Sequence, residues 1–329
     1  MTNVFRTILP PVPGAVSIHH AHRTLCVGSC FAEHIGGRLH ALKFPVLLNP
    51  FGIVYNPSSV ARSLEQLLGT ETYHPEHLFE NQGVWHSFDH HGRFSHPNSN
   101  TALDNMNRSL AAARHFLAKA DRLIVTLGTA NVFVLKKTGT VVANCHKVPG
   151  DSFDRRRLSI AETTDALLPV FEKLKERLPA LEIIATVSPV RHLRDGLVEN
   201  QRSKAVLLLA LEAINRQLPY VHYFPAYELL LDDLRDYRFY DSDMTHPAPL
   251  AVDYIWGYFR DAFFDEKTKA LCGRIEHVLA AAAHRPFHPE SEGHRRFIEK
   301  TLGEMDALER THPGLDFSQE RALLGHAGR

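Results

Sequence analysis

The stretch that decides the fold is TLCVGSCFAEHIGGRLHAL, residues 24–42. Its first five residues form an apolar run of strand length that ends at a glycine. Beyond them, an apolar stripe with helical spacing is made by Phe31, Ile35, Leu39 and Leu42. A strand, a two-residue turn and a helix follow one another here, which is typical of the start of a doubly wound α/β domain.

Four further runs are apolar and bounded by turn residues, at 44–48, 122–127, 182–187 and 220–224. The segments between them carry helical periodicity, most clearly at 160–178, 203–218 and 248–264. Pro169 lies inside the first of these segments and predicts a kink or a helix boundary. We therefore expect a three-layer α/β/α domain around a mostly parallel sheet of five strands.

Two regions interrupt this alternation. Residues 55–121 are expected to form an insertion, partly loop and partly helical at 103–118, that would serve as a lid and substrate selector. Residues 132–144 have the pattern of a β-hairpin that turns at KKTG. The predicted boundaries are an α/β domain at 1–265 and a helical C-terminal extension at 266–329.

The composition is that of a globular protein, because 44% of the 329 residues are hydrophobic and 22% are charged. Lys plus Arg equals Asp plus Glu at 37 each, so no overall field attracts nucleic acid or an anionic membrane, and neither partner is expected. The N-terminal sequence does not fit a secretory signal, and no apolar run reaches the roughly 18 residues of a membrane span. With four cysteines in the chain, these features predict a cytoplasmic protein with reduced thiols. The oligomeric state stays open.

Ligands of an open parallel sheet bind beyond the carboxyl ends of its strands. Ser29 and Cys30 follow the first strand at a helix N-terminus, where free N–H groups and the helix dipole favour an oxyanion. Either side chain is a candidate nucleophile. The structural alternatives are a helix N-cap for Ser29 and a buried small hydrophobe for Cys30. After the second strand, Gly52 is expected to bring a backbone N–H close to a substrate oxygen.

A candidate base lies far along the chain, in the segment that holds Asp243 and His246. An Asp three residues before a His, on a turn entering a helix, can hold the Nδ1–H of the imidazole and leave Nε2 free. A serine hydroxyl is a weak nucleophile until such a base takes its proton. The spacing therefore predicts a triad of Ser29, Asp243 and His246; the alternative is that the pair caps the helix near Pro247.

Six blocks of the sequence resemble motifs of the bacterial GSCFA family, which is placed in the SGNH or GDSL-like hydrolase clan: GSCFAEHIG, NPFGIVYNP, LGTANVF, VANCHKVP, VSPVRHLRDG and YRFYDSDMTHP. The resemblance spans most of residues 20–265 and is specific for the family rather than for a reaction. It implies an SGNH-hydrolase-like fold. Enzymes of this clan hydrolyse or transfer acyl groups with a serine in a first block, a Gly and an Asn as oxyanion donors, and a D-x-x-H pair near the C-terminus.

Carried over by position, the resemblance implies that Ser29 is the nucleophile and that Asp243 and His246 support it. It also implies that the N–H groups of Ser29 and Gly52 form part of the oxyanion hole. The usual G-D-S is here G-S-C, so that a thiol follows the serine, and Cys30 is the alternative nucleophile.

Two asparagines compete for the side-chain position in the oxyanion hole. The clan usually has a G-x-N-D block, and here residues 128–131 read G-T-A-N, so that Asn131 stands one position late. Asn144 reaches the site if the hairpin folds over it. Arg191 and His192 follow the fourth strand and are further candidates for substrate binding. With the neighbouring Arg194 they suit a carboxylate or phosphate, or else they belong to a surface ion network.

No metal or organic cofactor is expected. The sequence has no C-x-x-C or H-E-x-x-H signature, although Cys145 and His146 stand next to each other and Cys26, Cys30 and His34 lie in the first block. It also lacks a Walker-type phosphate loop and a G-x-G-x-x-G after the first strand. The insertion carries a histidine group that we expect on a solvated loop: His86, His90 and His91.

These observations predict a serine-dependent acyl-ester hydrolase of the SGNH type, acting through a covalent acyl-Ser29 intermediate. The expected substrate is a small or carbohydrate-linked ester, for example an acetyl ester; this follows from the clan resemblance alone. One alternative is an O-acyltransferase, in which a second alcohol replaces water at the same triad. Another is a non-catalytic carbohydrate-binding or scaffold protein.

Overall fold

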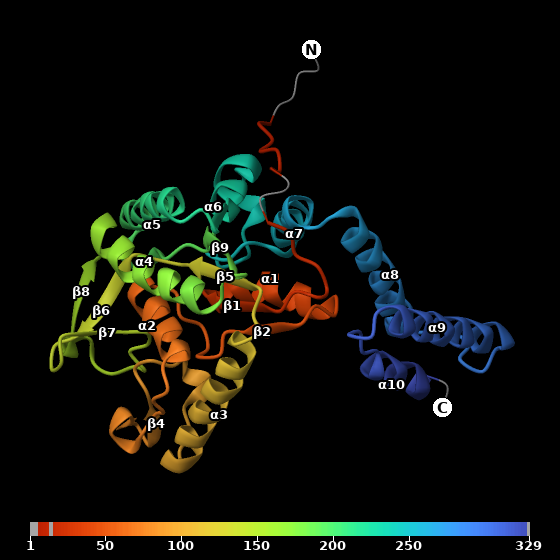
Figure 1. Ribbon diagram of the computed structural model, residues 1–329, viewed down its shortest axis with the longest axis horizontal. Coiled ribbons are helices and arrows are strands. Elements are labelled where there is room, and N and C mark those ends of the chain that lie inside the picture. The colour runs from red at the N-terminus through yellow and green to blue at the C-terminus, as the bar shows by residue number, and fades with distance from the viewer. Residues whose placement is uncertain (1–5, 13–15, 328–329) are drawn as a thin grey trace.

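The computed structural model describes residues 6–12 and 16–327. A parallel five-stranded sheet lies at its centre, in the order β10-β9-β5-β1-β2 (Figure 1). Its strands are β1 (Thr24–Gly28), β2 (Val46–Leu48), β5 (Arg122–Leu127), β9 (Glu182–Val187) and β10 (Val221–Phe224). The predicted fold class is confirmed; β2 and β10 begin slightly later than their apolar runs.

Helices cover both sides of this sheet. Successive side chains of a strand face opposite sides, and here both sets are apolar, so each side of the sheet packs against helices. Leu25, Val125 and Ala185 face one hydrophobic core, to which α2 (Pro57–Leu68), α3 (Ser99–Leu117), α4 (Ile160–Arg177) and α5 (Leu197–Gln217) contribute. Strand residues with the opposite parity, among them Cys26 and Ile184, face a second core that contains α1 (Cys30–Ala41) and α7 (Pro249–Phe263). The three layers are those expected from the sequence.

The connection between β2 and β5 is more regular than expected. It begins with α2, whose N-cap Asn56 accepts a hydrogen bond from the Ser59 N–H at 2.9 Å and whose first turn contains a proline. Two short strands follow, β3 (Phe79–Asn81) and β4 (Val84–His86), paired antiparallel. The helix predicted at 103–118 is α3, which starts four residues earlier.

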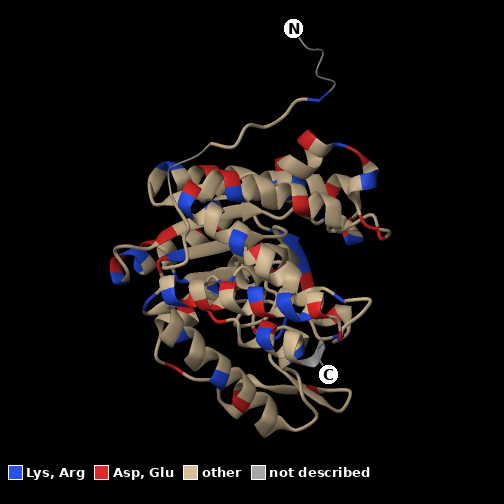
Figure 2. Cartoon of the chain, turned by 90° about the vertical axis from the view of Figure 1, so that its right-hand side faces the viewer, with Lys and Arg blue, Asp and Glu red and all other residues tan. Residues whose placement is uncertain are grey.

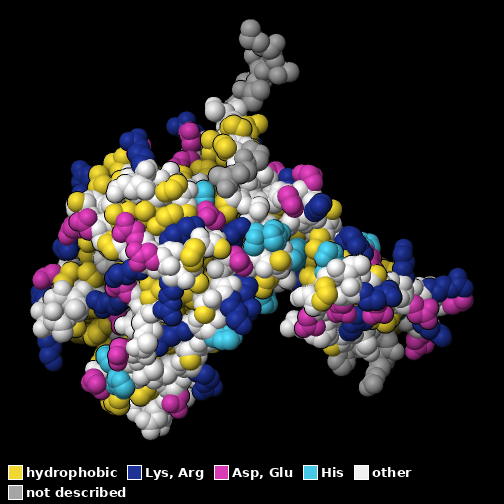
Figure 3. All heavy atoms as spheres, viewed as in Figure 1, with side chains coloured by type: hydrophobic (Ala, Val, Ile, Leu, Met, Phe, Trp, Pro, Cys, Tyr) yellow, Lys and Arg dark blue, Asp and Glu magenta, His cyan; other side chains and the backbone are white. Residues whose placement is uncertain are grey.

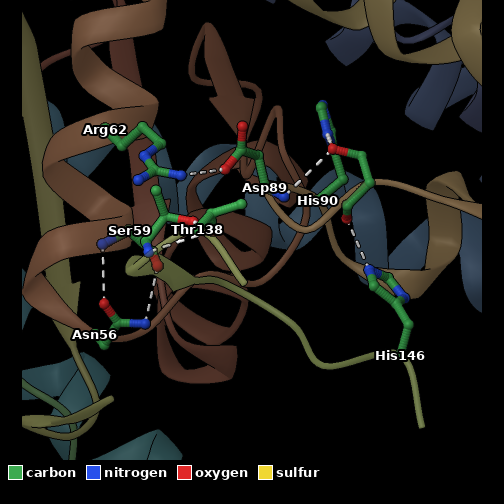
Figure 4. A network of polar contacts seen from close by, with 9 residues as sticks. Asn56, Ser59, Arg62, Asp89, His90, Thr138 and His146 are labelled. Atoms are coloured by element: carbon green, nitrogen blue, oxygen red, sulfur yellow. Dashed lines mark hydrogen bonds and ion pairs between the residues drawn. The ribbon is translucent and has the colours of Figure 1, made fainter. Parts of the chain in front are cut away.

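The histidines of this connection are not all solvated, which corrects our expectation. His90 is 1% exposed and packs against Phe51 and Tyr73. A polar network holds its segment in place (Figure 4): Arg62 pairs with Asp89 at 2.9 Å, and His146 Nε2 contacts the Ser87 carbonyl at 2.8 Å. The segment is therefore anchored to both α2 and the 143–149 loop.

A second, antiparallel sheet has the order β7-β6-β8. It consists of β6 (Asn131–Leu135), β7 (Thr140–Val142) and β8 (Phe153–Arg157). β6 starts four residues after β5 ends, so this sheet stands at the carboxyl edge of the parallel one. One-turn 3-10 helices connect other elements, at Pro75–His77, Gly92–Phe94, Gly150–Ser152, Leu193–Asp195 and Tyr237–Phe239.

The chain ends in helices α8 (Glu266–Ala283), α9 (Glu292–Thr311) and α10 (Ser318–Ala327), at the right of Figure 1. Between β10 and α7 lie the short α6 (Ala226–Glu228) and a π-helical turn (Leu229–Leu234). Figure 3 shows histidine side chains on the face where the α/β body meets the C-terminal helices. Acidic and basic residues are interspersed along the helices (Figure 2). Within residues 6–12 and 16–327, no helix is long and apolar enough to cross a membrane.

Candidate active site

The carboxyl ends of neighbouring strands are aligned, so the segments that follow them meet at one edge. Gly28 of β1 is in register with Thr126 of β5, which is in register with Thr186 of β9, and Phe224 of β10 is in register with Thr186. A Cβ on Gly28 would lie 2.3 Å from the Thr126 carbonyl oxygen, and its φ is +148°. Only glycine allows β1 to turn into α1 this close to β5.

Ser29 is the N-cap of α1. Its Oγ accepts a hydrogen bond from the Phe31 N–H at 3.2 Å, and the residue is only 2% exposed. Its own N–H donates to the Thr126 carbonyl at 3.0 Å. The oxyanion role expected for this N–H is therefore corrected, because the group already has a backbone partner inside the fold.

Cys30 is the first residue of α1 and is half-buried. An N–H in the first turn of a helix has no helical carbonyl to bind, so the Cys30 N–H points out of the helix N-terminus. Burial raises the pKa of the Cys30 thiol, and Glu33 acts in the same direction. The backbone N–H groups of Cys30 and Phe31 and the charge of Lys204 oppose that shift of the pKa.

Asp243 and His246 form the contact that their spacing predicts. Asp243 Oδ2 lies 2.6 Å from His246 Nδ1, and its Oδ1 accepts the N–H groups of Thr245 at 2.8 Å and His246 at 2.9 Å. The backbone and side-chain hydrogen bonds of His246 lower the pKa of Asp243 to about 2. A carboxylate held in this way fixes the imidazole orientation and leaves Nε2 directed outward.

Burial lowers the pKa of His34, which lies one turn after Cys30 in α1, and Arg38 and His246 act in the same direction. His246 therefore lies near this helix. The imidazole of His246 is 45% exposed. Among the described residues, no hydrogen bond joins its Nε2 to Ser29 or Cys30. The candidate base is therefore not hydrogen-bonded to either candidate nucleophile in the described part of the chain.

Arg191 holds the loop that carries the pair. Its N–H donates to the Thr245 carbonyl at 3.1 Å, and its guanidinium lies 3.7 Å from the ring centroid of Tyr240. These contacts connect the segment after β9 to the Asp243–His246 turn. These contacts give Arg191 a role in holding the turn; its role in substrate binding stays a prediction.

His192 points inward. Its Nε2 is buried without a hydrogen-bond partner in the described part of the chain, 2.9 Å from where a Cβ on Gly128 would lie. Its ring packs 5.2 Å from that of Tyr55. Burial, reinforced by the charges of Lys204, His246 and Arg155, lowers the pKa of His192 to about 3. The imidazole is therefore neutral at physiological pH.

The two candidate asparagines differ in what their amides already bind. Asn131 Nδ2 donates to Asp195 Oδ2 at 3.0 Å, so part of its donor capacity is used. Asn144 Oδ1 accepts the His146 N–H at 2.9 Å, and its Nδ2 has no partner among the residues that the structure describes. Burial is the main reason why the pKa of the Tyr55 hydroxyl is raised. Cys145, next to Asn144, and Cys30 add to this rise, so both thiols lie near Tyr55.

Gly52 also has a structural explanation. Its N–H donates to the Asn49 carbonyl at 2.7 Å, so the expected oxyanion donor is already bound in a turn. Its φ is +77°, and a Cβ would lie 2.2 Å from the Cβ of His91. Glycine is required at this position because His91 of the insertion approaches so closely. This corrects the expectation that the Gly52 N–H binds a substrate oxygen.

The chain matches the GSCFA family over residues 23–259. It belongs to the GSCFA family. A separate family, the GSCFA domain protein C-terminal domain, matches residues 275–326. No curated protein sequence matches the chain. Among solved structures, it is similar to an acetyl xylan esterase from the rumen bacterium Butyrivibrio proteoclasticus, with a TM-score of 0.36 and 13% identity. That match covers 74% of this chain and 65% of the esterase, so the GSCFA chain spans less than two thirds of that protein.

Sequence reasoning missed one buried charge in this GSCFA chain. Lys204 of α5 is 1% exposed, and its Nζ donates to the carbonyls of Gly128 and Ser188 at 2.6 Å each. The signal was a lysine on the apolar stripe of a predicted helix, in line with Leu207 and Leu211. Across residues 6–12 and 16–327, no group of three or more His, Cys, Asp or Glu side chains is arranged to hold a metal ion.

Proposed function

We propose that this GSCFA protein is an acyl-ester hydrolase that works through a covalent acyl-enzyme at the N-terminus of α1. The observation that carries the proposal is the 2.6 Å contact between Asp243 and His246 at the sheet edge where α1 begins. Such a pair supplies an oriented base. The substrate class, a small or carbohydrate-linked ester such as an acetyl ester, follows from the resemblance to the SGNH clan.

The geometry favours Cys30 over Ser29 as the nucleophile. The Ser29 hydroxyl is almost fully buried and caps the helix, and it would have to release the Phe31 N–H before attacking a substrate. The Cys30 thiol is half-buried, and it stands third in G-S-C, as the serine stands third in G-D-S. Because burial raises the pKa of the Cys30 thiol, the thiol needs a general base to remove its proton. We assign this role to His246.

The proposed reaction has two steps, formation of a thioester and its hydrolysis. Nε2 of His246 takes the thiol proton while sulfur attacks the ester carbonyl, and the proton passes to the alkoxide as its C–O bond breaks. Water then attacks the thioester, giving its proton to His246, which returns it to the departing thiolate. The Cys30 N–H faces the developing oxyanion, together with a side-chain amide for which Asn144 has a free Nδ2.

The test is to map the acyl adduct. The full chain is incubated with p-nitrophenyl acetate, quenched and digested, and the acetylated peptide is identified by mass spectrometry. The variants are Cys30→Ala and Ser29→Ala, with Cys145→Ala as the control for a second half-buried thiol. We expect the adduct on Cys30, lost only in Cys30→Ala.

Two other results would contradict parts of the proposal. An adduct on Ser29 that persists in Cys30→Ala would return the role to the serine. No adduct and no ester hydrolysis in the folded wild-type chain would refute the hydrolase proposal and leave the binding-protein alternative.

A further inference from the structure

A cavity of about 640 Å³ lies beside β10, at one edge of the parallel sheet, and the proposed acyl transfer gives it no role. Its walls come mainly from β10, α6, the π-helical turn, α7 and the N-terminal segment. This segment passes close to α7 (Figure 1), where the Pro10 carbonyl accepts a hydrogen bond from the Tyr258 hydroxyl at 3.0 Å. Ligand sites in proteins typically have volumes of about 300–1,000 Å³, so this cavity is large enough for a small molecule.

Much of the lining of this cavity is apolar. Phe224 of β10 and Phe263 of α7 are buried, and their ring centroids lie 5.8 Å apart. Ile8 lines the cavity from the N-terminal segment and is 54% exposed, so the cavity is open to solvent on this side. Burying an alkyl or aryl group against such a surface removes apolar area from water, which favours binding.

The polar part of the lining contains a carboxyl group without a cationic partner. Glu228 of α6 is half-buried, and the Tyr223 hydroxyl donates to its Oε1 and Oε2 at 2.8 Å each. No lysine, arginine or histidine pairs with Glu228 among the residues that the structure describes. His222, which also lines the cavity, has a carboxylate of its own, because its Nε2 lies 2.7 Å from Glu182 Oε2. A carboxylate partly removed from water is stabilised by a nearby cation.

The other two acidic residues of the lining are already paired. Asp233 Oδ1 lies 2.9 Å from Arg6 Nε, and Asp232 Oδ1 lies 3.6 Å from Arg235 Nη1. In the described part of the chain, no lysine or arginine lines the cavity itself. An anionic ligand would therefore meet three carboxyl groups and no cation, whereas an ammonium group would find Glu228 unpaired.

We propose that the cavity binds a small primary amine, whose ammonium group pairs with Glu228 and whose alkyl or aryl body packs against Phe224 and Phe263. An ammonium group supplies three donors, and the Glu228 carboxylate, which accepts the Tyr223 hydroxyl, has further lone pairs for them. The inference does not rest on the hydrolase proposal, because none of the lining residues belongs to the proposed active site.

The test is a ligand-observed NMR titration of the full chain with n-hexylamine, 1-hexanol and hexanoate, which share one apolar body and differ in charge. We expect the amine to bind about tenfold or more tightly than the alcohol and the hexanoate anion. Glu228→Gln keeps the size of the side chain and removes its charge, so it should weaken amine binding by about tenfold or more and leave alcohol binding unchanged. Asp232→Asn is the matched control, because it removes a charge that Arg235 already pairs.

Several results would overturn the proposal. Equal affinities of hexylamine and hexanol would show that the apolar lining alone attracts the ligand. Unchanged amine binding in Glu228→Gln, or an equal loss in Asp232→Asn, would remove the role of Glu228. A folded wild-type chain that does not bind hexylamine would refute the site altogether.

Two further substitutions test whether the ligand lies in this cavity. Ala262→Phe fills the cavity from α7, and Ile8→Lys brings a competing ammonium group to its open side without disturbing the core. Leu250→Lys adds the same charge at a position of α7 that is 64% exposed and does not line the cavity. We expect the first two variants to weaken amine binding and the third to leave it unchanged. Unchanged affinity in both Ala262→Phe and Ile8→Lys would overturn the proposal.

A last variant separates this site from the proposed active site. Asp243→Asn alters the pair that the acyl transfer uses, and it should leave hexylamine binding unchanged. A loss of binding in this variant would place the amine at the active site and overturn the inference. Because the titration needs no ester turnover, its result is independent of the acyl-adduct experiment.

Discussion

Asp243 orients the imidazole of His246 through the contact between its Oδ2 and Nδ1 of the ring. Asp243→Asn keeps an oxygen that accepts the backbone N–H groups of Thr245 and His246, but it offers no charge to the imidazole. We expect kcat/KM for ester hydrolysis to fall by roughly 10³- to 10⁴-fold without unfolding, since the wrong imidazole tautomer is then favoured. Asp241→Asn, in the same turn, should leave the rate unchanged. A loss below about tenfold in Asp243→Asn would show that His246 needs no such partner.

The same carboxylate has a defined pH dependence. Its pKa is lowered from an ordinary 3.8 to about 2, so its ionised form stabilises the folded turn at every pH above 3.8 and the contribution is lost as the pH falls toward 2. Carbon-13 NMR of the Asp243 carboxyl should show this midpoint. In His246→Ala the midpoint should rise part of the way back, because the side-chain hydrogen bond is removed and the backbone ones remain. An Asp243 that titrates at 3.8 in the wild type would contradict the contact.

Gly28 should tolerate no side chain. Gly28→Ala places a Cβ 2.3 Å from the Thr126 carbonyl oxygen at a φ of +148°, and we expect it to lower the free energy of unfolding by about 3 kcal/mol or more. Gly37→Ala in α1 meets nothing within 4 Å and should raise stability by about 0.5–1 kcal/mol. Urea denaturation measures both. Equal effects of the two substitutions would show that β1 and β5 can separate at this point.

At the scale of elements, α1 depends on its cap. Ser29→Ala leaves the Phe31 N–H without its oxygen acceptor, and we expect a loss of about 1 kcal/mol in the free energy of unfolding. Ser159→Ala, which removes the N-cap of α4, provides a comparison with no connection to the site. A Ser29→Ala protein that is as stable as the wild type but unreactive toward esters would argue for the serine as nucleophile.

The sequence predicted the elements of the sheet well because each strand is buried on both faces and therefore reads as a continuous apolar run. It missed α2, although Asn56 and Pro57 are a helix start signal, because the insertion was predicted to be helical only at 103–118. Pro169 did not end α4. Its side chain is on the exposed face, where water can satisfy the carbonyl that a missing N–H leaves unpaired.

The site was predictable where its contacts are local. Asp243 and His246 are three residues apart, and the turn alone brings them together. The role of the Ser29 N–H was not predictable, because the carbonyl that binds it belongs to Thr126 of another strand. The Gly52 N–H, by contrast, binds the Asn49 carbonyl within a local turn, which is a contact of the predictable kind. Lys204 was missed for a related reason, since its acceptors follow two different strands.

At the scale of the whole molecule, the C-terminal helices share a core with the sheet. The second hydrophobic core runs from β1 and α1 through α7 into α8, α9 and α10, where it includes Ile275, Met305 and Phe317. Lys43, in the turn between α1 and β2, pairs with Glu320 of α10 at 2.8 Å, and both side chains are largely buried. The α/β body and the C-terminal helices should therefore lose structure in a coupled way.

Phe317 tests this coupling. It is fully buried, its N–H donates to Glu309 at 2.9 Å, and Lys43 lies 5.4 Å from its ring centroid. Phe317→Ala leaves a cavity in the second core, and we expect a loss of about 3–5 kcal/mol, whereas Phe287→Ala, at a site 97% exposed, should cost almost nothing.

Hydrogen exchange locates the effect of Phe317→Ala. Protection should fall in α8, α9 and α10. It should also fall in α1, because its last residues precede Lys43 and belong to the same core, whereas α2 and α4 on the opposite face should stay protected. Faster exchange confined to α10 would show that the C-terminal helices pack on the body without stabilising it. Because α1 carries the candidate nucleophile at its other end, its protection shows whether the C-terminal helices stabilise the helix on which the proposed acyl transfer depends.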